Sequence, residues 1–171
     1  MSNQNSLKKI RIDVSGGFLV FIAGAYVLAG KKAFFAASAA VLAHETGHLL
    51  AMLLTGGEPT GIRMEAHGLR IDADSHGSPI ISAAAGPAAG LLFAALARGE
   101  TGRVSLALSL FNLLPYSKLD GGRMLSGRIS QRAGTVLDCV SVLIMLAFGL
   151  FSRGAAAAGF WLLVDFAFGL L

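Results

Sequence analysis

Charged side chains are scarce in this sequence of 171 residues. Asp, Glu, Lys and Arg make up 14% of it, against about a quarter in soluble proteins, while hydrophobic residues make up 54%. This composition is typical of an integral membrane protein and argues against an ordinary soluble domain. The basic residues behind the net charge of +4 are scattered between apolar segments. We therefore expect them to contact lipid headgroups, and we expect no nucleic-acid partner.

Cysteine is nearly absent as well. The single residue, Cys139, excludes an intrachain disulfide and any cysteine-rich zinc site. It lies in an apolar run, where a lone cysteine behaves as a small hydrophobic residue, so we interpret it as a packing residue.

Histidine occurs only four times, yet two of the four stand in His44-Glu45-Thr46-Gly47-His48. Residues i and i+4 share one face of a helix, so both imidazoles can bind one zinc ion while Glu45 reaches a water at the open coordination position. Glu45 is the only charged residue in the range 33–57, and ionisable groups in such a segment are usually functional. The motif therefore predicts a zinc hydrolase. The alternative is a non-catalytic membrane binding or transport protein that uses the same metal site.

Six apolar segments predict an all-α integral membrane protein with about six transmembrane helices and one short β-hairpin after the second helix. The first segment could be a signal peptide, but five later ones favour a retained helix. The fourth is short and contains Pro115, so we expect it to be broken. We expect one membrane-embedded domain over residues 1–171. The predicted spans cover residues 14–30, 33–56, 77–97, 104–115, 133–152 and 154–171.

The hairpin is predicted where the hydrophobic period changes from helical to two, over residues 61–74. His67-Gly68 supplies its turn. The hairpin is either a connector at the membrane surface or an edge that pairs with an extended substrate segment, because a peptide bond within a helix is poorly accessible. We expect no metal at His67 or His76.

The distribution of Lys and Arg predicts the orientation. With the N-terminus in the cytoplasm, nine basic residues lie inside and five outside, so we expect both termini to be cytoplasmic. The inner end of the second helix and Asp120 then lie on the same side of the membrane.

Two imidazoles leave a zinc ion in need of a third protein ligand, and three carboxylates are candidates. Asp120 follows the broken fourth helix and precedes two flexible glycines. Glu65 lies seventeen residues past His48, and Glu58 is closer still. The spacing favours Asp120 over Glu65, and Glu58 is too close to His48. A structural role for all three carboxylates is the remaining alternative.

Three short stretches stand out together: His44-Glu45-Thr46-Gly47-His48, Phe111-Asn112-Leu113-Leu114-Pro115 and Leu119-Asp120-Gly121-Gly122-Arg123. Together they resemble the site-2 protease family of intramembrane zinc metalloproteases, peptidase family M50. The resemblance covers nearly the whole chain and is greatest to the compact six-helix branch, the stage IV sporulation protein FB type. It implies one Zn²⁺ per chain bound by His44, His48 and Asp120, with Glu45 as catalytic base. Asn112 would hold the substrate or the transition state near the metal.

The resemblance also implies a reaction: hydrolysis of a peptide bond in or near a membrane segment of a substrate protein. In the sporulation branch the substrate is a membrane-tethered sigma-factor precursor, which regulated intramembrane proteolysis releases to the cytoplasm. The membrane would be the bacterial cytoplasmic membrane or one that surrounds the forespore. We expect no PDZ or CBS domain, so regulation would need separate membrane proteins. Asp138 and Asp165 match no family motif, and we expect helix-helix hydrogen bonds or partner contacts for them.

Overall fold

The computed structural model describes residues 11–65, 68–73 and 78–150, together with positions 159, 162, 163 and 166. Backbone contacts divide the chain into two compact units, Met1–Leu110 and Phe111–Leu171. Each unit is described by itself below. The single membrane domain over residues 1–171 stays a prediction.

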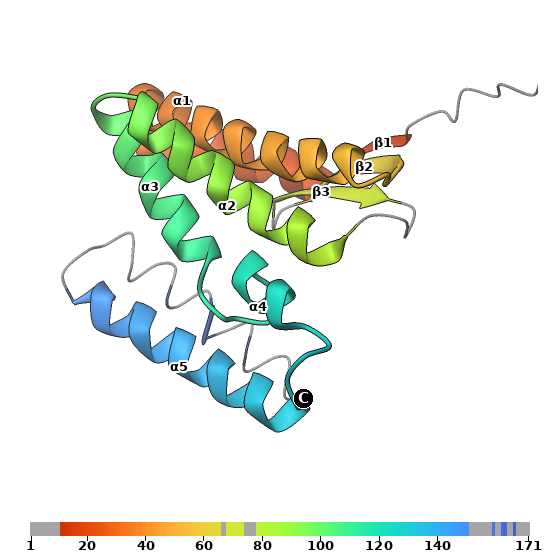
Figure 1. Ribbon diagram of the computed structural model, residues 1–171. Coiled ribbons are helices and arrows are strands. Elements are labelled where there is room, and N and C mark those ends of the chain that lie inside the picture. The colour runs from red at the N-terminus through yellow and green to blue at the C-terminus, as the bar shows by residue number, and fades with distance from the viewer. Residues whose placement is uncertain are drawn as a thin grey trace, which may run out of the picture. The chain divides into compact units, whose positions relative to one another are not determined.

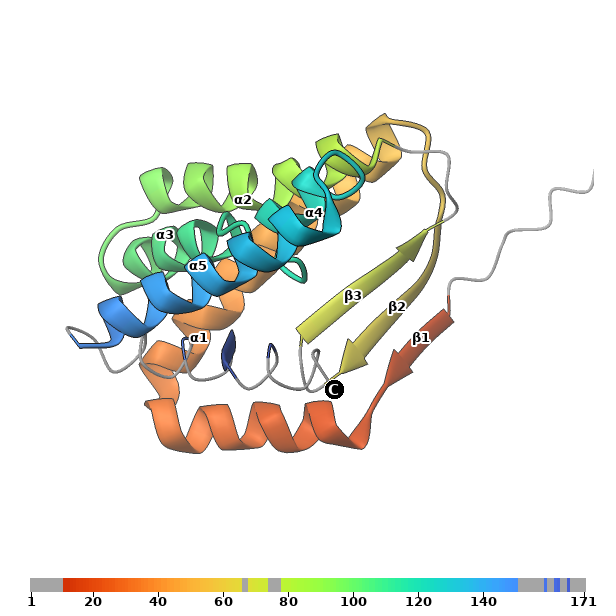
Figure 2. The same cartoon turned by 90° about the horizontal axis from the view of Figure 1, so that it is seen from below.

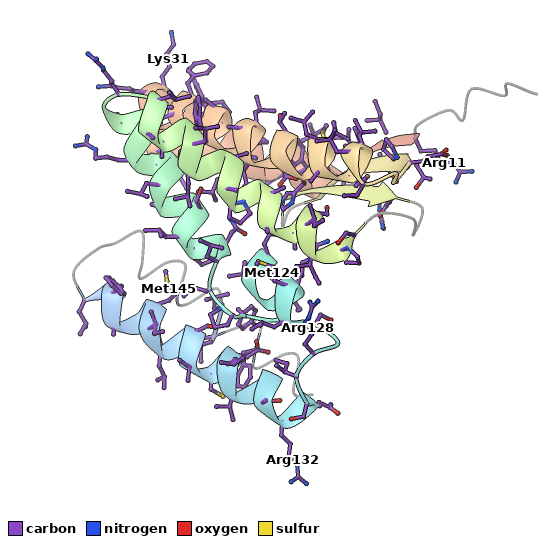
Figure 3. The ribbon with its side chains drawn as sticks, in the orientation of Figure 1. Arg11, Lys31, Met124, Arg128, Arg132 and Met145 are labelled. Atoms are coloured by element: carbon purple, nitrogen blue, oxygen red, sulfur yellow. The ribbon has the colours of Figure 1, made fainter. Side chains whose placement is uncertain are left out.

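The first unit is built on the long helix α1, Gly16–Leu54, which packs along α2, Pro79–Leu96 (Figure 1). Figure 2 shows that α1 consists of two arms. They meet at Gly30, where φ is 78°, a conformation that glycine adopts at little steric cost. The side chain of Lys31, next to this bend, points away from the ribbon (Figure 3). The two arms correspond to the spans predicted over residues 14–30 and 33–56.

The predicted hairpin is confirmed. Strand β2, Pro59–Glu65, pairs in antiparallel fashion with β3, Gly68–Ala73, so that Ile62 lies opposite Ile71 and Met64 opposite Leu69. Position 67 of the predicted turn lies outside the described residues, as does His76.

The sheet has a third strand that the sequence did not predict. Strand β1, Arg11–Val14, runs parallel to β2, with Arg11 opposite Gly61 and Val14 opposite Met64. The backbone N–H of Ser15 then donates to the Met64 carbonyl at 2.9 Å. The prediction of a lone hairpin in an all-α protein is therefore corrected to a small mixed sheet of order β1-β2-β3.

Helix α3, Glu100–Asn112, has 13 residues and is shorter than a membrane span, as expected for the fourth apolar segment. Within the first unit, small residues hold it against α2. The Ser105 hydroxyl donates to the Gly90 carbonyl at 2.8 Å, and a side chain at Gly90 would collide with Ser109. Close backbone approach with hydroxyl hydrogen bonds is a common way to join helices in lipid.

The second unit contains α4, Asp120–Leu125, and α5, Gln131–Gly149. Its core is formed by Tyr116, Leu119, Val142 and Leu162. The sequence predicted a break before Asp120 but no helix there. The last predicted span, residues 154–171, lies almost entirely outside the described residues.

In the described part of the chain, three helices are long and apolar enough to cross a membrane: α1, α2 and α5. Large apolar side chains are exposed on these helices, as on a lipid-facing surface; Leu28 is 89% exposed and Leu54 86%. The figure of six spans stays a prediction.

Candidate metal centre

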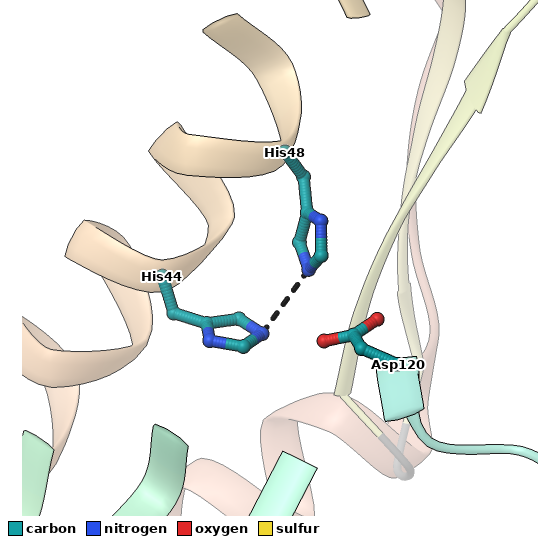
Figure 4. A group of neighbouring side chains, drawn as sticks. All are labelled: His44, His48 and Asp120. Atoms are coloured by element: carbon teal, nitrogen blue, oxygen red, sulfur yellow. Dashed lines mark hydrogen bonds between the residues drawn. The ribbon is translucent and has the colours of Figure 1, made fainter. Parts of the chain in front are cut away.

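The second arm of α1 carries His44, Glu45 and His48. The two histidines lie one turn apart on one face, and His44 is buried, with 4% of its surface exposed. Their Nε2 atoms are 3.1 Å apart, and the rings meet edge to face (Figure 4). The structure thus brings together the two histidines that the sequence predicted as metal ligands.

The spacing of these two nitrogens fits a zinc ion. Zinc binds histidine nitrogen at about 2.0–2.1 Å in a tetrahedral arrangement, which places two such nitrogens about 3.3 Å apart. The observed 3.1 Å is close to this value. No rearrangement of the helix is needed for both imidazoles to bind one ion.

Helix α2 sets the tautomer of His48. The His48 Nδ1 atom lies 2.7 Å from the Ser82 carbonyl oxygen. Because a carbonyl can only accept, Nδ1 carries the proton and donates it, which leaves the Nε2 lone pair directed toward His44. Metal-binding histidines commonly use their second nitrogen in this way.

Two glycines make room for this arrangement. A Cβ atom at Gly86 would collide with the His48 ring, so only glycine leaves space for the imidazole. A Cβ atom at Gly47 would lie 2.6 Å from the Ala89 side chain and 2.9 Å from the Ala85 carbonyl carbon. The motif helix can therefore pack closely on α2 only because positions 47 and 86 lack side chains.

Among the carboxylates of the first unit, Glu45 is half-buried on α1. Glu58 is exposed just beyond the helix and joins no group of three possible metal ligands among the described residues. Glu65 ends β2, where its backbone pairs with Gly68.

Asp120 belongs to the second unit, where it begins α4 and is 5% exposed. Its Oδ1 atom lies 3.4 Å from a guanidinium nitrogen of Arg123, one turn along the helix. A Cβ atom at Gly121 would collide with the carbonyls of residues 113 and 114, and one at Gly122 with the carbonyl of Tyr116. The two glycines thus let the first turn of α4 lie directly against the preceding loop.

The remaining residues that the sequence analysis singled out lie on α3, on α5 or outside the described residues. Asn112 ends α3 and is half-buried. Asp138, on α5, accepts a hydrogen bond from the Ser117 backbone N–H, a contact that the sequence did not predict because the two residues are far apart in the chain. Cys139 is a free, half-buried thiol, in keeping with a packing residue. Asp165 lies outside the described residues.

Comparison with known proteins places the fold. No protein-family model matches the chain. A candidate zinc metalloprotease of Synechocystis sp. is 34% identical over 116 aligned positions, which cover 56% of this chain. The chain spans 31% of the length of that relative. The Site-2 Protease from Methanocaldococcus jannaschii matches with a TM-score of 0.59 and 20% identity, over 88% of this chain and 86% of that protein. The chain therefore has the fold of that protease.

Proposed function

We propose that this chain is an intramembrane zinc metalloendopeptidase of the site-2 protease family. The observation that carries the proposal is the pair formed by the buried His44 and the half-buried His48, whose Nε2 atoms lie 3.1 Å apart beside Glu45 on an apolar helix. The likeness in fold to a site-2 protease and the similarity to a candidate zinc metalloprotease support it. We also propose that the chain belongs to the compact sporulation branch of this family.

Asp120 is proposed as the third ligand. Added to the two imidazoles, its carboxylate would complete a donor set that suits a catalytic zinc. Its burial supports this role, because a carboxylate that is 5% exposed needs a cationic partner.

The proposed zinc ligands, Glu45 and Asn112 have separate roles in peptide hydrolysis. A zinc ion held by the three ligands would supply Lewis-acid polarisation of the scissile carbonyl. Glu45 takes a proton from the attacking water as the water oxygen bonds to the carbonyl carbon, and returns it to the leaving nitrogen as the C–N bond breaks. The Asn112 amide donates a hydrogen bond to the substrate near the reacting carbonyl. The products are one carboxylate and one amine terminus.

The substrate is proposed to be a membrane protein or a membrane-tethered protein, such as a sigma-factor precursor, that is released to the cytoplasm. An extended substrate segment can add as a further strand to the sheet that contains β2 and β3. The presence of this sheet supports the proposal that a substrate helix is opened next to it. Both termini are proposed to be cytoplasmic, in the bacterial cytoplasmic membrane or a membrane around the forespore. Separate membrane proteins would regulate the enzyme.

Glu45→Gln tests the proposed chemistry. We expect cells with the wild-type protein to accumulate membrane-protein fragments that cells with Glu45→Gln lack, because an amide cannot accept the water proton. N-terminal labelling and mass spectrometry of the two membrane fractions measure this difference. The purified variant should keep one zinc ion per chain. The same fragments produced by a zinc-loaded Glu45→Gln protein would refute the role of Glu45.

Asp120→Ala tests the third ligand, with Glu58→Gln as the matched control. We expect Asp120→Ala to bind zinc at least about tenfold more weakly, because a ligand is lost, and Glu58→Gln to bind it as the wild type does. Competition with a chromophoric chelator measures both affinities. Zinc retained at wild-type affinity in Asp120→Ala would show that Asp120 is not the third ligand.

A further inference from the structure

Helix α5 carries one acidic residue, Asp138, about two turns from its beginning. An ionisable group inside an apolar helix is costly in a membrane, so it usually has a defined task. The proposed hydrolysis does not use Asp138. Its carboxylate has a hydrogen-bond partner in another segment of the chain.

The carboxylate holds a backbone segment. Asp138 Oδ1 accepts a hydrogen bond from the Ser117 N–H at 2.7 Å, a short distance for such a bond. This bond ties the loop between α3 and α4 to a side chain of α5.

That loop is in direct contact with the turn that begins at Asp120. The Leu119 N–H donates to the Tyr116 carbonyl at 2.9 Å. A Cβ atom at Gly122 would lie 2.7 Å from the Ser117 nitrogen, so the glycine backbone rests on the same peptide group that Asp138 binds. A displacement of the Ser117 peptide would therefore displace the first turn of α4.

The surroundings of Asp138 are polar. It lines a pocket of about 290 Å³ together with Ser117, Ser126, Ser130, Gln131 and Thr135. Polar groups line this pocket next to the carboxylate, and ionisable residues of membrane helices commonly face such water-accessible spaces. The pocket lies entirely within the second unit.

We infer that Asp138 is a positioning residue for the metal site. Its carboxylate holds the Ser117 peptide, the loop holds the Gly121-Gly122 turn, and the turn fixes the position of Asp120. This inference rests on the proposed function, because it gives Asp120 the role of a zinc ligand.

The test compares Asp138→Ala with Asp138→Asn in the full chain. Asparagine keeps an oxygen that can accept from Ser117, whereas alanine removes it. Hydrogen-deuterium exchange of the metal-free protein is measured over residues 116–122, and zinc affinity is measured by chelator competition. For Asp138→Ala we expect exchange roughly tenfold faster in this segment and zinc binding about tenfold weaker. Asp138→Asn should stay within about threefold of the wild type on both measures.

Thr135→Val is the matched control, because Thr135 lines the same pocket but its hydroxyl donates to the Gln131 carbonyl of its own helix. It should change neither measurement. If Asp138→Ala does not fold, Asp138→Glu, which displaces the carboxylate by one methylene, takes its place with the same expectation. Unchanged exchange in Asp138→Ala, or an equal loss in Asp138→Asn, would overturn the inference. Absence of zinc binding by the wild type would instead overturn the proposed function, since exchange is measured without metal.

Discussion

Replacement of Gly86 by alanine should damage the zinc site while leaving the fold intact. Gly86 lies on α2, opposite His48, and an added Cβ atom would lie 2.7 Å from the imidazole Cδ2 and closer still to Nε2 and Cε1. Ordinary contacts between carbon atoms are about 3.5–4.0 Å, so the ring would have to move by about 1 Å. Zinc sites tolerate ligand displacements of only about 0.2 Å. The imidazole therefore cannot keep its place as a ligand.

The cost to the metal-free protein should be small by comparison. Alanine is favoured over glycine inside a helix by about 0.5–1 kcal/mol. Displacement of His48 would break its bond to the Ser82 carbonyl, a loss of about 0.5–1.5 kcal/mol. These two effects nearly cancel. The added Cβ atom meets the end of a side chain that can move, whereas at Gly47 it meets backbone atoms, so the thermal midpoint of Gly86→Ala should change little. The zinc affinity, in contrast, should fall by roughly 10- to 100-fold, the usual effect of disturbing the support of a metal ligand.

The assay is chelator competition with purified protein in detergent, together with thermal unfolding of the metal-free form. Gly24→Ala is the control, because Gly24 lies within α1 and nothing is within 4 Å of the position of its added Cβ atom. Wild-type zinc affinity in Gly86→Ala would refute the reasoning. Equal losses in both variants would point to a general effect on the helices.

Two further substitutions should act on stability. Gly47→Ala should lower the free energy of unfolding by about 1–3 kcal/mol, because the added methyl group overpacks the contact with Ala85 and Ala89. Thermal unfolding measures this loss, with Gly24→Ala as the control. An unchanged thermal midpoint in Gly47→Ala would contradict the prediction. Arg63→Ala removes a bidentate bond of 2.7 Å to Asp72 on the neighbouring strand. Because both side chains are partly exposed, we expect a loss of at most about 1 kcal/mol, seen as faster hydrogen exchange in β2 and β3 with zinc affinity unchanged; slower exchange or weaker zinc binding would contradict this.

The features that the sequence predicted correctly are those with local signals. The i, i+4 spacing placed His44 and His48 on one helical face, and alternating polarity identified the hairpin of β2 and β3. The short length of the fourth apolar segment matched α3, which ends at Asn112. In each case the residues that determine the structure lie within about ten positions of one another.

The features that were missed depend on distant contacts. Strand β1 has four exposed residues and pairs with a strand about fifty positions away, so its own pattern carries no strand signal. Helix α4 contains two glycines, which oppose a helix by propensity, but their close contacts with the preceding loop override that preference. The bond from Ser117 to Asp138 joins two parts of the chain that no local pattern connects.

Glycine has the same physical role beside the proposed ligands in both units. At Gly86 the missing side chain leaves space for the His48 ring, and at Gly121 and Gly122 it lets the backbone that carries Asp120 rest on carbonyl groups of the loop. A ligand held by backbone contact has few alternative positions, because main-chain atoms in packed helices move less than side chains. Such a site loses little entropy when it binds a metal, since its ligands are already ordered. The small residues around the motifs therefore support the proposed metal site as well as helix packing.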